Sequence, residues 1–341
     1  MAENRGAFVE RAQRLAEEVL YPAASAVDGS GQVPGRHWEV LAEEGFYGLP
    51  VAGLEFPEIV RVIELLAGGC LATAFVWLQH NGAVLSLAGS QNAALREMYF
   101  DDLVSGRRRA GAAFAGAVTE PAKLWARPVE GGYVLNGTAP FVSGWGIVDL
   151  LQVAARSTDE KPGDTVVSGL IEASASDTMS AEPIALIAGQ ATATVRLRFD
   201  DHPLPAARVT GVARFGDFAG LQTFGSRLNG ALACGIADRA IILLDAAAAT
   251  SAAKALREQL DGVRVALDQA MADAAALQVA RGQAAELAVR AATALVAATG
   301  AAALLPELPA GRLLREAAFT SVAASRPEMR AAIVDVVSAP R

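Results

Sequence analysis

The spacing of apolar residues changes twice along the chain, and this change constrains the fold more than any single motif does. In residues 8–19 apolar side chains recur every three or four positions, which is typical of an amphipathic helix. In residues 194–200 they alternate with polar side chains, which indicates a strand with one buried face. The sequence therefore predicts an α+β fold with an N-terminal all-α domain (1–109), a middle antiparallel β-barrel-like domain (110–212) and a C-terminal helical bundle (213–341).

Start and stop residues predict three helices in the N-terminal part. The first ends at Pro22, because proline does not continue a helix. The second ends near Gly45, and the third begins at Pro57, a residue that suits a first helical turn. Residues 65–95 lack charges, but polar residues such as Asn81 interrupt them, so we expect a helix buried in this domain and not a membrane span.

Turn residues divide the middle part into short strands. Residues 130–132 and the pair Asn136-Gly137 flank a short β-rich run, residues 133–135. Asn-Gly is a strong hairpin signal. We therefore expect a meander or small barrel with tight hairpins.

The C-terminal part is rich in alanine and leucine. It has no proline between Ala240 and Gly300, and its alanine-rich segments have high helix propensity. Small side chains let helices approach closely. We expect long helices packed as a bundle, with an alanine-lined face that suits self-association into a homodimer or homotetramer.

Composition argues against several functional classes. The chain has 341 residues, 52% of them hydrophobic, and a net charge of −8, so the basic field that holds a nucleic-acid backbone is missing. The first residues lead into alternating charges, so we expect no secretory signal. The two cysteines, Cys70 and Cys234, have apolar neighbours and are expected to be buried thiols in a reducing compartment. These features predict a cytoplasmic globular protein without a nucleic-acid or membrane partner.

General catalytic motifs are absent from the sequence. The three histidines, His37, His80 and His202, are too scattered for a metal-binding helix motif, and there is no Cys-x-x-Cys pair, Walker loop or nucleophile elbow. We expect no metal site. At His80, between two polar residues of an apolar segment, a hydrogen-bonded core histidine is favoured over a catalytic base.

Five strings of residues occur in an order typical of one protein family. The most extended is residues 133–144 in the predicted β domain, and the others are residues 114–121, 199–205, 232–240 and 312–317. In this order, together with the helical, β and helical parts, they make the chain resemble the acyl-CoA dehydrogenase superfamily of flavoproteins, and the resemblance covers nearly the whole chain. The resemblance implies an FAD-dependent oxidoreductase of fatty acid metabolism that acts on an acyl-CoA, or a related flavin-dependent oxidation.

The resemblance assigns flavin contacts to four residues. Phe141, Val142 and Ser143 match the family's aromatic-aliphatic-Ser/Thr triplet, which lies against the isoalloxazine ring. A flat apolar ring with a polar edge needs an aromatic wall and a hydroxyl or amide donor near N5, where hydride arrives. Thr119, in a Thr-Glu-Pro string, matches a contact with the pyrimidine edge of the flavin.

Other parts of the family's FAD site are missing. Residues 122–124 are Ala-Lys-Leu where the family has a pyrophosphate-binding Gly-Ser-Asp. Residues 247–254 lack the arginine of an Arg-x-x-Phe-Gly turn, and residues 298–301 keep one glycine of a Gly-Gly-x-Gly segment. Each lost hydrogen bond to a charged group costs about 1.5–3 kcal/mol. We therefore expect FAD to be bound weakly or not at all.

The family's catalytic glutamate has no counterpart in the sequence. Family dehydrogenases carry this glutamate at one of two positions. These positions correspond here to residues 319–325 and 225–227, and neither segment contains Asp or Glu. The catalytic residue therefore stays unidentified, and the loss of a positioned base removes a factor of about 10²–10⁴ in rate. Arg227 is a candidate substrate-binding residue that could hold an anionic ligand, with a bundle salt bridge as the alternative.

Two classes of function follow from this pattern. The retained triplet at residues 141–143 favours a flavin enzyme, either a dehydrogenase with an unrecognised base or an oxygen-using relative that needs none. The missing FAD contacts favour a catalytically deficient structural subunit that pairs with an active paralogue in a hetero-oligomer. The sequence predicts little or no acyl-CoA dehydrogenase activity for the isolated chain.

Overall fold

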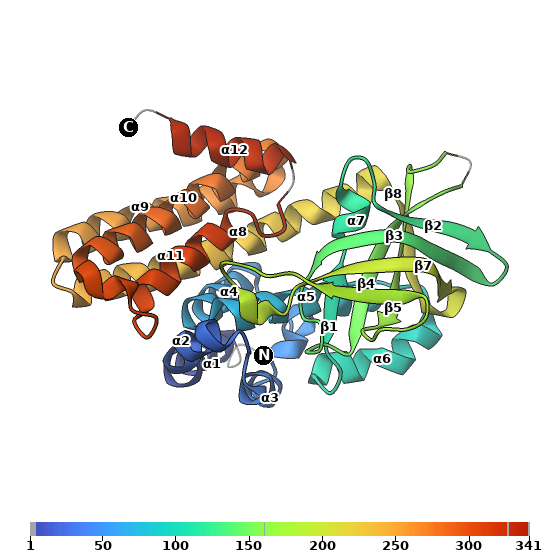
Figure 1. Ribbon diagram of the computed structural model, residues 1–341, viewed down its shortest axis with the longest axis horizontal. Helices are drawn as coiled ribbons and strands as arrows, with labels where there is room; N and C mark the ends of the chain where they lie inside the picture. Colours follow the sequence, from blue (N-terminus) through green and yellow to red (C-terminus); the bar gives the residue numbers. More distant parts are fainter. Residues whose placement is uncertain (1–4, 160, 326, 340–341) are drawn as a thin grey trace.

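The chain folds into helices, then a sheet, then helices, as predicted. The structure is a computed structural model that describes residues 5–159, 161–325 and 327–339. Figure 1 shows the sheet at one end of the molecule, the C-terminal bundle at the other, and the N-terminal helices packed between and below them. One hydrophobic core cluster contains residues from all three parts. The predicted α+β fold class is confirmed.

The N-terminal part is helical throughout. Its main elements are α1 (Arg5–Leu15), the π-helix η2 (Ala16–Leu20), α2 (Tyr21–Ser30), α3 (Gly35–Glu43), the 3-10 helix η3 (Phe46–Val51), α4 (Phe56–Gly69), α5 (Leu71–Ala88) and α6 (Ala93–Ser105).

The predicted helix stop at Pro22 is wrong. A π-helical turn precedes Tyr21, and Pro22 lies in the first turn of α2, where the backbone nitrogen needs no helical partner. The other predicted ends hold, because α3 ends just before Gly45 and α4 begins beside Pro57 with a capping box at Glu55. Residues 65–95 are not one helix but the end of α4, all of α5 and the start of α6, and α5 is buried along most of its length within the helical part, as expected.

Eight strands form the middle part. They are β1 (Ala110–Ala113), β2 (Leu124–Val129), β3 (Gly132–Val142), β4 (Leu150–Ser157), β5 (Thr165–Glu172), β6 (Met179–Pro183), β7 (Val195–Pro205) and β8 (Val209–Arg214), with the short helix α7 (Ala115–Val118) after β1. The order across the sheet is β6-β7-β3-β2-β4-β5-β8, and β1 pairs with β4. Most pairs are antiparallel, as expected, but β4 pairs in parallel with both β1 and β2, so the sheet is mixed.

The predicted turn at Asn136-Gly137 is wrong, whereas the turn at residues 130–132 joins β2 to β3. Gly137 lies inside β3 with a φ of 114°, at a register shift between β3 and β7. A Cβ there would lie 2.1 Å from the Lys123 carbonyl oxygen, so the glycine allows a bulge against a neighbouring loop. An Asn-Gly pair therefore marks a bulge here and not a hairpin.

The C-terminal part is a helical bundle. Its helices are α8 (Phe215–Ala246), α9 (Thr250–Gln269), α10 (Ala274–Thr299), α11 (Pro309–Thr320) and α12 (Pro327–Ser338). Figure 1 shows α8 running from the sheet into the bundle, where α9, α10 and α11 pack beside it. By length and composition alone the stretch Ala274–Leu304 could cross a membrane, but it packs as a bundle element with 33% of its most apolar part buried.

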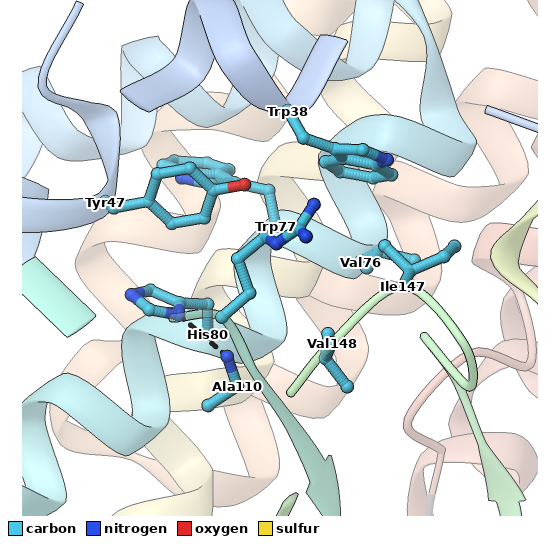
Figure 2. Close-up of a pocket in the computed structure, with 9 residues that line it drawn as sticks. Trp38, Tyr47, Val76, Trp77, His80, Ala110, Ile147 and Val148 are labelled. Atoms are coloured by element: carbon cyan, nitrogen blue, oxygen red, sulfur yellow. Dashed lines mark hydrogen bonds between the residues drawn. The ribbon is translucent and has the colours of Figure 1, made fainter. Parts of the chain in front are cut away.

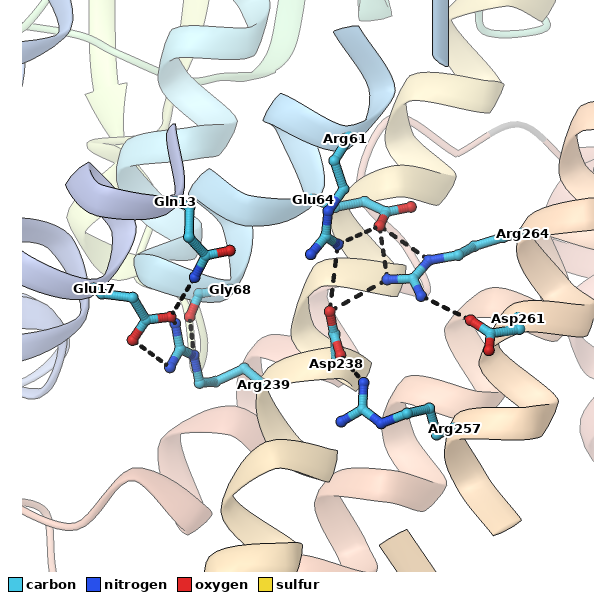
Figure 3. A network of polar contacts seen from close by, with 10 residues as sticks. All are labelled: Gln13, Glu17, Arg61, Glu64, Gly68, Asp238, Arg239, Arg257, Asp261 and Arg264. Atoms are coloured by element: carbon cyan, nitrogen blue, oxygen red, sulfur yellow. Dashed lines mark hydrogen bonds and ion pairs between the residues drawn. The ribbon is translucent and has the colours of Figure 1, made fainter. Parts of the chain in front are cut away.

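Buried ion pairs join the N-terminal helices to the bundle (Figure 3). Glu64 of α4 is 3% exposed and accepts from Arg264 of α9 at 2.8 Å, while Asp238 of α8 accepts from Arg257 at 2.8 Å. Burial raises the pKa of Asp238, but the three surrounding arginines outweigh burial and lower it overall. Every carboxylate in this network therefore has a cationic partner. The two cysteines are buried thiols, as predicted.

Candidate functional site

His80 lies in a closed part of the molecule and is not a base. Figure 2 shows it below Tyr47 and Trp77, beside a cavity of about 10 Å³. The Ala110 backbone N–H donates to Nδ1 at 3.0 Å, so Nε2–H donates to the Leu103 carbonyl at 3.1 Å. Burial lowers the pKa of His80 to about 4. The interpretation as a hydrogen-bonded core histidine is confirmed.

Phe141 combines a left-handed backbone conformation with an exposed aromatic ring. It lies near the end of β3, where the register against β7 shifts between Ala139 and Val142. Its φ is 54°, a left-handed conformation that a bulky side chain rarely adopts, and 65% of the residue is exposed. An exposed aromatic ring held in a strained backbone costs free energy without adding core packing, which is the pattern expected of a binding surface.

The two residues after Phe141 are held in place by burial and hydrogen bonds. Val142 is fully buried, and Ser143 is 7% exposed. The Ser143 hydroxyl lies 2.7 Å from that of Thr194, and Thr194 lies 2.7 Å from the hydroxyl of Thr192. The Gly144 N–H also donates to the Thr192 carbonyl at 2.7 Å. The predicted triplet is therefore one rigid unit with an exposed ring and a buried hydroxyl.

The loop that carries Thr119 is pinned beside the same strand. Backbone bonds run from Lys123 N–H to the Gly116 carbonyl and from Thr138 N–H to the Lys123 carbonyl, each 2.8 Å long. Thr138 precedes Phe141 by three residues in β3, so this loop lies on the flank of the strand that presents the ring. The Thr119 hydroxyl is half-buried and donates to the Gly116 carbonyl at 3.4 Å.

Arg227 is buried in the bundle. It is 1% exposed and donates from Nε and Nη2 to Asp268 at 2.8 and 2.7 Å, so the bundle salt bridge is present. Its Nη1 has no hydrogen-bond partner among the residues that the structure describes. A role toward substrate stays a prediction.

Side-chain packing fills residues 319–325, the first of the two segments where family members carry the catalytic glutamate. The Phe319 ring contacts Phe75 of α5 edge-on, with 5.0 Å between ring centroids. A Cβ added at Gly189 would lie 3.1 Å from the same ring. The nearby carboxylate of Glu316 is buried and accepts twice from Arg312 at 2.9 and 3.0 Å, and burial raises its pKa. This acid is therefore engaged inside α11.

The described residues fit the isoalloxazine half of FAD better than its diphosphate half. Phe141 offers an exposed flat apolar face, and two residues further along the chain Ser143 carries a hydroxyl that lies 2.7 Å from that of Thr194; an aromatic wall and a hydroxyl suit a ring with a polar edge. The loop at residues 119–124 presents the exposed cation Lys123. The guanidinium of nearby Arg156 is already engaged within the protein and is not free to bind a diphosphate. It donates to the Ala117 carbonyl at 2.7 Å and lies 3.2 Å over the Phe215 ring.

Sequence reasoning missed two residues of this site, Thr192 and Thr194. They lie in and after the 3-10 helix η4 (Gln190–Thr192), about fifty residues beyond the triplet, and only the pairing of β3 with β7 brings them to Ser143. A Thr-x-Thr spacing before a strand carries no functional signal of its own.

Comparison with known proteins gives the same fold along the whole chain. The family model for the acyl-CoA dehydrogenase N-terminal domain matches residues 2–107. Butyryl-CoA dehydrogenase from Megasphaera elsdenii superposes with a TM-score of 0.82 at 19% identity, over 97% of each chain. The structure of PigA with FAD and proline superposes with a TM-score of 0.81 at 21% identity, over 96% of each chain.

Curated relatives match a smaller part of the chain than these solved structures do. Acryloyl-CoA reductase (NADH) from Anaerotignum propionicum is 29% identical over 250 residues, which cover 68% of this chain and 62% of that protein. The chain spans about half to three fifths of the length of the first curated relatives that it matches.

Proposed function

Because the chain belongs to the acyl-CoA dehydrogenase superfamily, we propose that it is a flavin-dependent oxidoreductase whose flavin ring lies against Phe141 and Ser143. The observation that carries this proposal is Phe141 itself, an aromatic side chain 65% exposed with a φ of 54°. Among the described residues, Phe141 belongs to none of the hydrophobic core clusters. A flat ligand stacked on it would bury the ring and account for the strain.

Each predicted contact residue would bind a different part of the flavin. Phe141 supplies the apolar wall, and fully buried Val142 keeps that wall in place. Ser143 sets the polar contact near the edge of the ring, and Thr119 is the candidate for the pyrimidine edge. A bound FAD would supply the hydride acceptor for the oxidation, and these residues would hold its ring. With Lys123 as the exposed cation of the 119–124 loop, we expect weak binding of the diphosphate half.

We propose an acyl thioester, or the substrate of a related flavin-dependent oxidation, as the reactant. Residues 319–325 and 225–227 bring no carboxylate to either family position of the base. The isolated chain is therefore expected to dehydrogenate acyl-CoA slowly or not at all, because an α-C–H is a very weak acid that needs a positioned base. Arg227 remains the candidate for holding an anionic part of the substrate.

A second candidate function is that of a structural subunit paired with an active paralogue. The packing of Phe319 against Phe75 and Gly189 favours it, because side chains fill the first family position of the base. Both candidates include self-association through the bundle as a homodimer or homotetramer, or association with a paralogue. Sedimentation at micromolar concentration tests this, and a monomer would contradict it. The cytoplasmic location likewise stays a prediction.

The proposal is tested by titrating the purified chain with FAD and following the flavin fluorescence. We expect micromolar affinity that falls about tenfold or more in Phe141→Ala, since stacking on an aromatic ring is lost. Met98→Ala is the matched control, because Met98 is exposed to a similar degree, 62%, on α6. Nanomolar affinity that Phe141→Ala leaves unchanged would contradict the proposed site.

A panel of short, long and ring-bearing acyl-CoAs then separates the two candidates. The assay uses an artificial electron acceptor and added FAD, with the chain alone and after co-expression with paralogues. Turnover only in the presence of a paralogue supports the structural subunit. Robust turnover by the chain alone would show that a base lies elsewhere in the chain.

A further inference from the structure

Three hydroxyl groups form a chain that ends at Ser143. The Thr192 hydroxyl lies 2.7 Å from the Gly189 carbonyl oxygen, Thr194 lies 2.7 Å from Thr192, and Ser143 lies 2.7 Å from Thr194. The three residues are 0%, 4% and 7% exposed. We call Thr192, Thr194 and Ser143 the hydroxyl relay.

The relay has one favourable direction. A carbonyl oxygen only accepts, so the single Thr192 proton is donated to Gly189. Thr192 then has only lone pairs left for Thr194, so Thr194 donates to Thr192, and by the same reasoning Ser143 donates to Thr194. The reverse direction would place the lone pairs of Thr192 and Gly189 against each other at 2.7 Å without a proton between them, in a buried site that water does not screen.

The direction decides what Ser143 offers to a ligand. Its only proton is used inside the protein, so its oxygen presents lone pairs and acts as an acceptor. This reverses the expectation that the hydroxyl at this position is a donor. The position of Thr192, which does not contact Ser143 in the described hydrogen bonds, therefore controls the polarity of a group two hydroxyls away.

We propose that the hydroxyl relay makes Ser143 select reduced over oxidised flavin. This inference rests on the proposed function, because it takes the flavin ring to lie beside Ser143. Flavin N5 is a hydrogen-bond acceptor when oxidised and carries an N–H donor when reduced. An acceptor-only Ser143 satisfies the N5–H of the reduced ring and faces the lone pair of the oxidised one. Thr192 and Thr194 are thus positioning residues that raise the reduction potential of the bound flavin.

The proposal is tested by comparing the dissociation constants of oxidised and anaerobically reduced FAD. In Thr194→Val, Ser143 regains a free proton that it can donate to oxidised N5. We expect the preference for reduced flavin to fall about tenfold, which for a two-electron couple lowers the potential by about 30 mV. Thr192→Val should move the ratio in the same direction, because it frees the Thr194 proton and, through it, the Ser143 proton.

Conservative variants and a matched control separate the relay from simple packing. Thr192→Ser and Thr194→Ser keep the hydroxyls and should keep the wild-type ratio. Thr210→Val removes the hydroxyl of another buried threonine, in β8, which has no hydrogen-bond partner among the described residues, and should change nothing. If the Thr→Val variants of the relay weaken both redox states by the same factor, the hydroxyls only support the fold and the proposal is overturned.

A second measurement does not depend on flavin. Neutron diffraction from crystals of the ligand-free protein locates the three hydroxyl deuterons. We expect them on the lines from Thr192 to Gly189, Thr194 to Thr192 and Ser143 to Thr194. The opposite order overturns the relay even if flavin binds. The expected order with no affinity for either form of FAD would uphold the relay but overturn the proposed function and the selection of reduced flavin.

Discussion

The two junctions of the molecule treat their polar groups in opposite ways. Where the N-terminal helices meet the bundle, buried carboxylates such as Glu64 are matched by arginines (Figure 3). Where the sheet meets α5 and α11, the Arg312–Glu316 pair is closed within α11, and the groups that lead to the triplet are neutral: a chain of hydroxyls reaches Ser143, and the Phe141 ring lies exposed. At the first junction each carboxylate of the network is paired with an arginine, whereas at the second we propose that Ser143 and Phe141 present an acceptor and an apolar face to a ligand.

This difference shows how a binding site can be recognised without a catalytic motif. Fully paired charges hold elements together, and removing one partner leaves a buried charge. A site for a ligand instead combines backbone strain with an exposed apolar face, as at Phe141. We therefore expect the ion-paired junction of the N-terminal helices with the bundle, the closed junction, to control stability, and the junction around residues 141–143, the open junction, to control binding.

The largest expected effect is at the closed junction. Glu64→Ala leaves Arg264 beside a buried position without its closest carboxylate, and we expect a loss of about 3 kcal/mol in the free energy of unfolding. Urea denaturation measures it. Glu39→Ala removes an exposed carboxylate from a surface pair and should cost less than about 1 kcal/mol. Equal effects of the two substitutions would contradict the contrast between the junctions.

The next effect comes from His80, in the closed seam between α5 and β1. Burial lowers its pKa from 6.5 to about 4, so between these pH values the unfolded chain binds a proton that the fold does not. The contribution to stability is present above pH 6.5 and is lost as the pH falls toward 4, by about 2–3 kcal/mol. Urea denaturation at several pH values measures this slope, and His80→Gln should flatten it. A slope that the substitution leaves unchanged would show that other groups cause it.

A smaller effect is expected at Gly189, the acceptor at the end of the relay. Its φ is 67°, and a Cβ would press on the Phe319 ring, so Gly189→Ala should destabilise the fold by about 1–2 kcal/mol. Gly53→Ala is the control, because Gly53 has a φ of 72° but nothing within 4 Å of an added Cβ. Thermal unfolding that ranks the two variants equally would mean that Phe319 yields freely.

The smallest effect isolates the strain at Phe141. Phe141→Gly and Phe141→Ala both remove the ring, but only glycine adopts a φ of 54° without cost. We expect the glycine variant to be more stable than the alanine variant by about 1 kcal/mol, and both to lose FAD affinity alike. If alanine is the more stable of the two, the strain argument for this residue is wrong.

The sequence predicts much of the fold because the hydrophobic period is a local property. The change from helical to alternating spacing identifies the three parts, and Pro57 and Gly45 mark helix ends through their own backbone preferences. Local signals mislead where tertiary contacts decide. Pro22 lies in the first turn of α2, directly after a π-helical turn, instead of ending the helix. Gly137 lies at a bulge, where the Lys123 carbonyl approaches too closely for a side chain.

In the candidate site, too, residues that are contiguous in sequence could be predicted, whereas their partners from distant segments could not. The triplet at residues 141–143 is contiguous, so a resemblance can point to it. The polarity of Ser143 depends on Thr192 and Thr194, which strand pairing brings near, and on the direction of three protons. The bundle salt bridge of Arg227 depends on Asp268, a partner on another helix. Neither partnership has a pattern that sequence spacing alone reveals.

A crystal structure of the protein soaked with FAD would locate the flavin ring relative to Phe141 and Ser143. We predict electron density for the isoalloxazine ring stacked on Phe141, with N5 within hydrogen-bond distance of the Ser143 hydroxyl. Flavin density at any other position, with Phe141 still exposed to solvent, would show that residues 141–143 are not the flavin site.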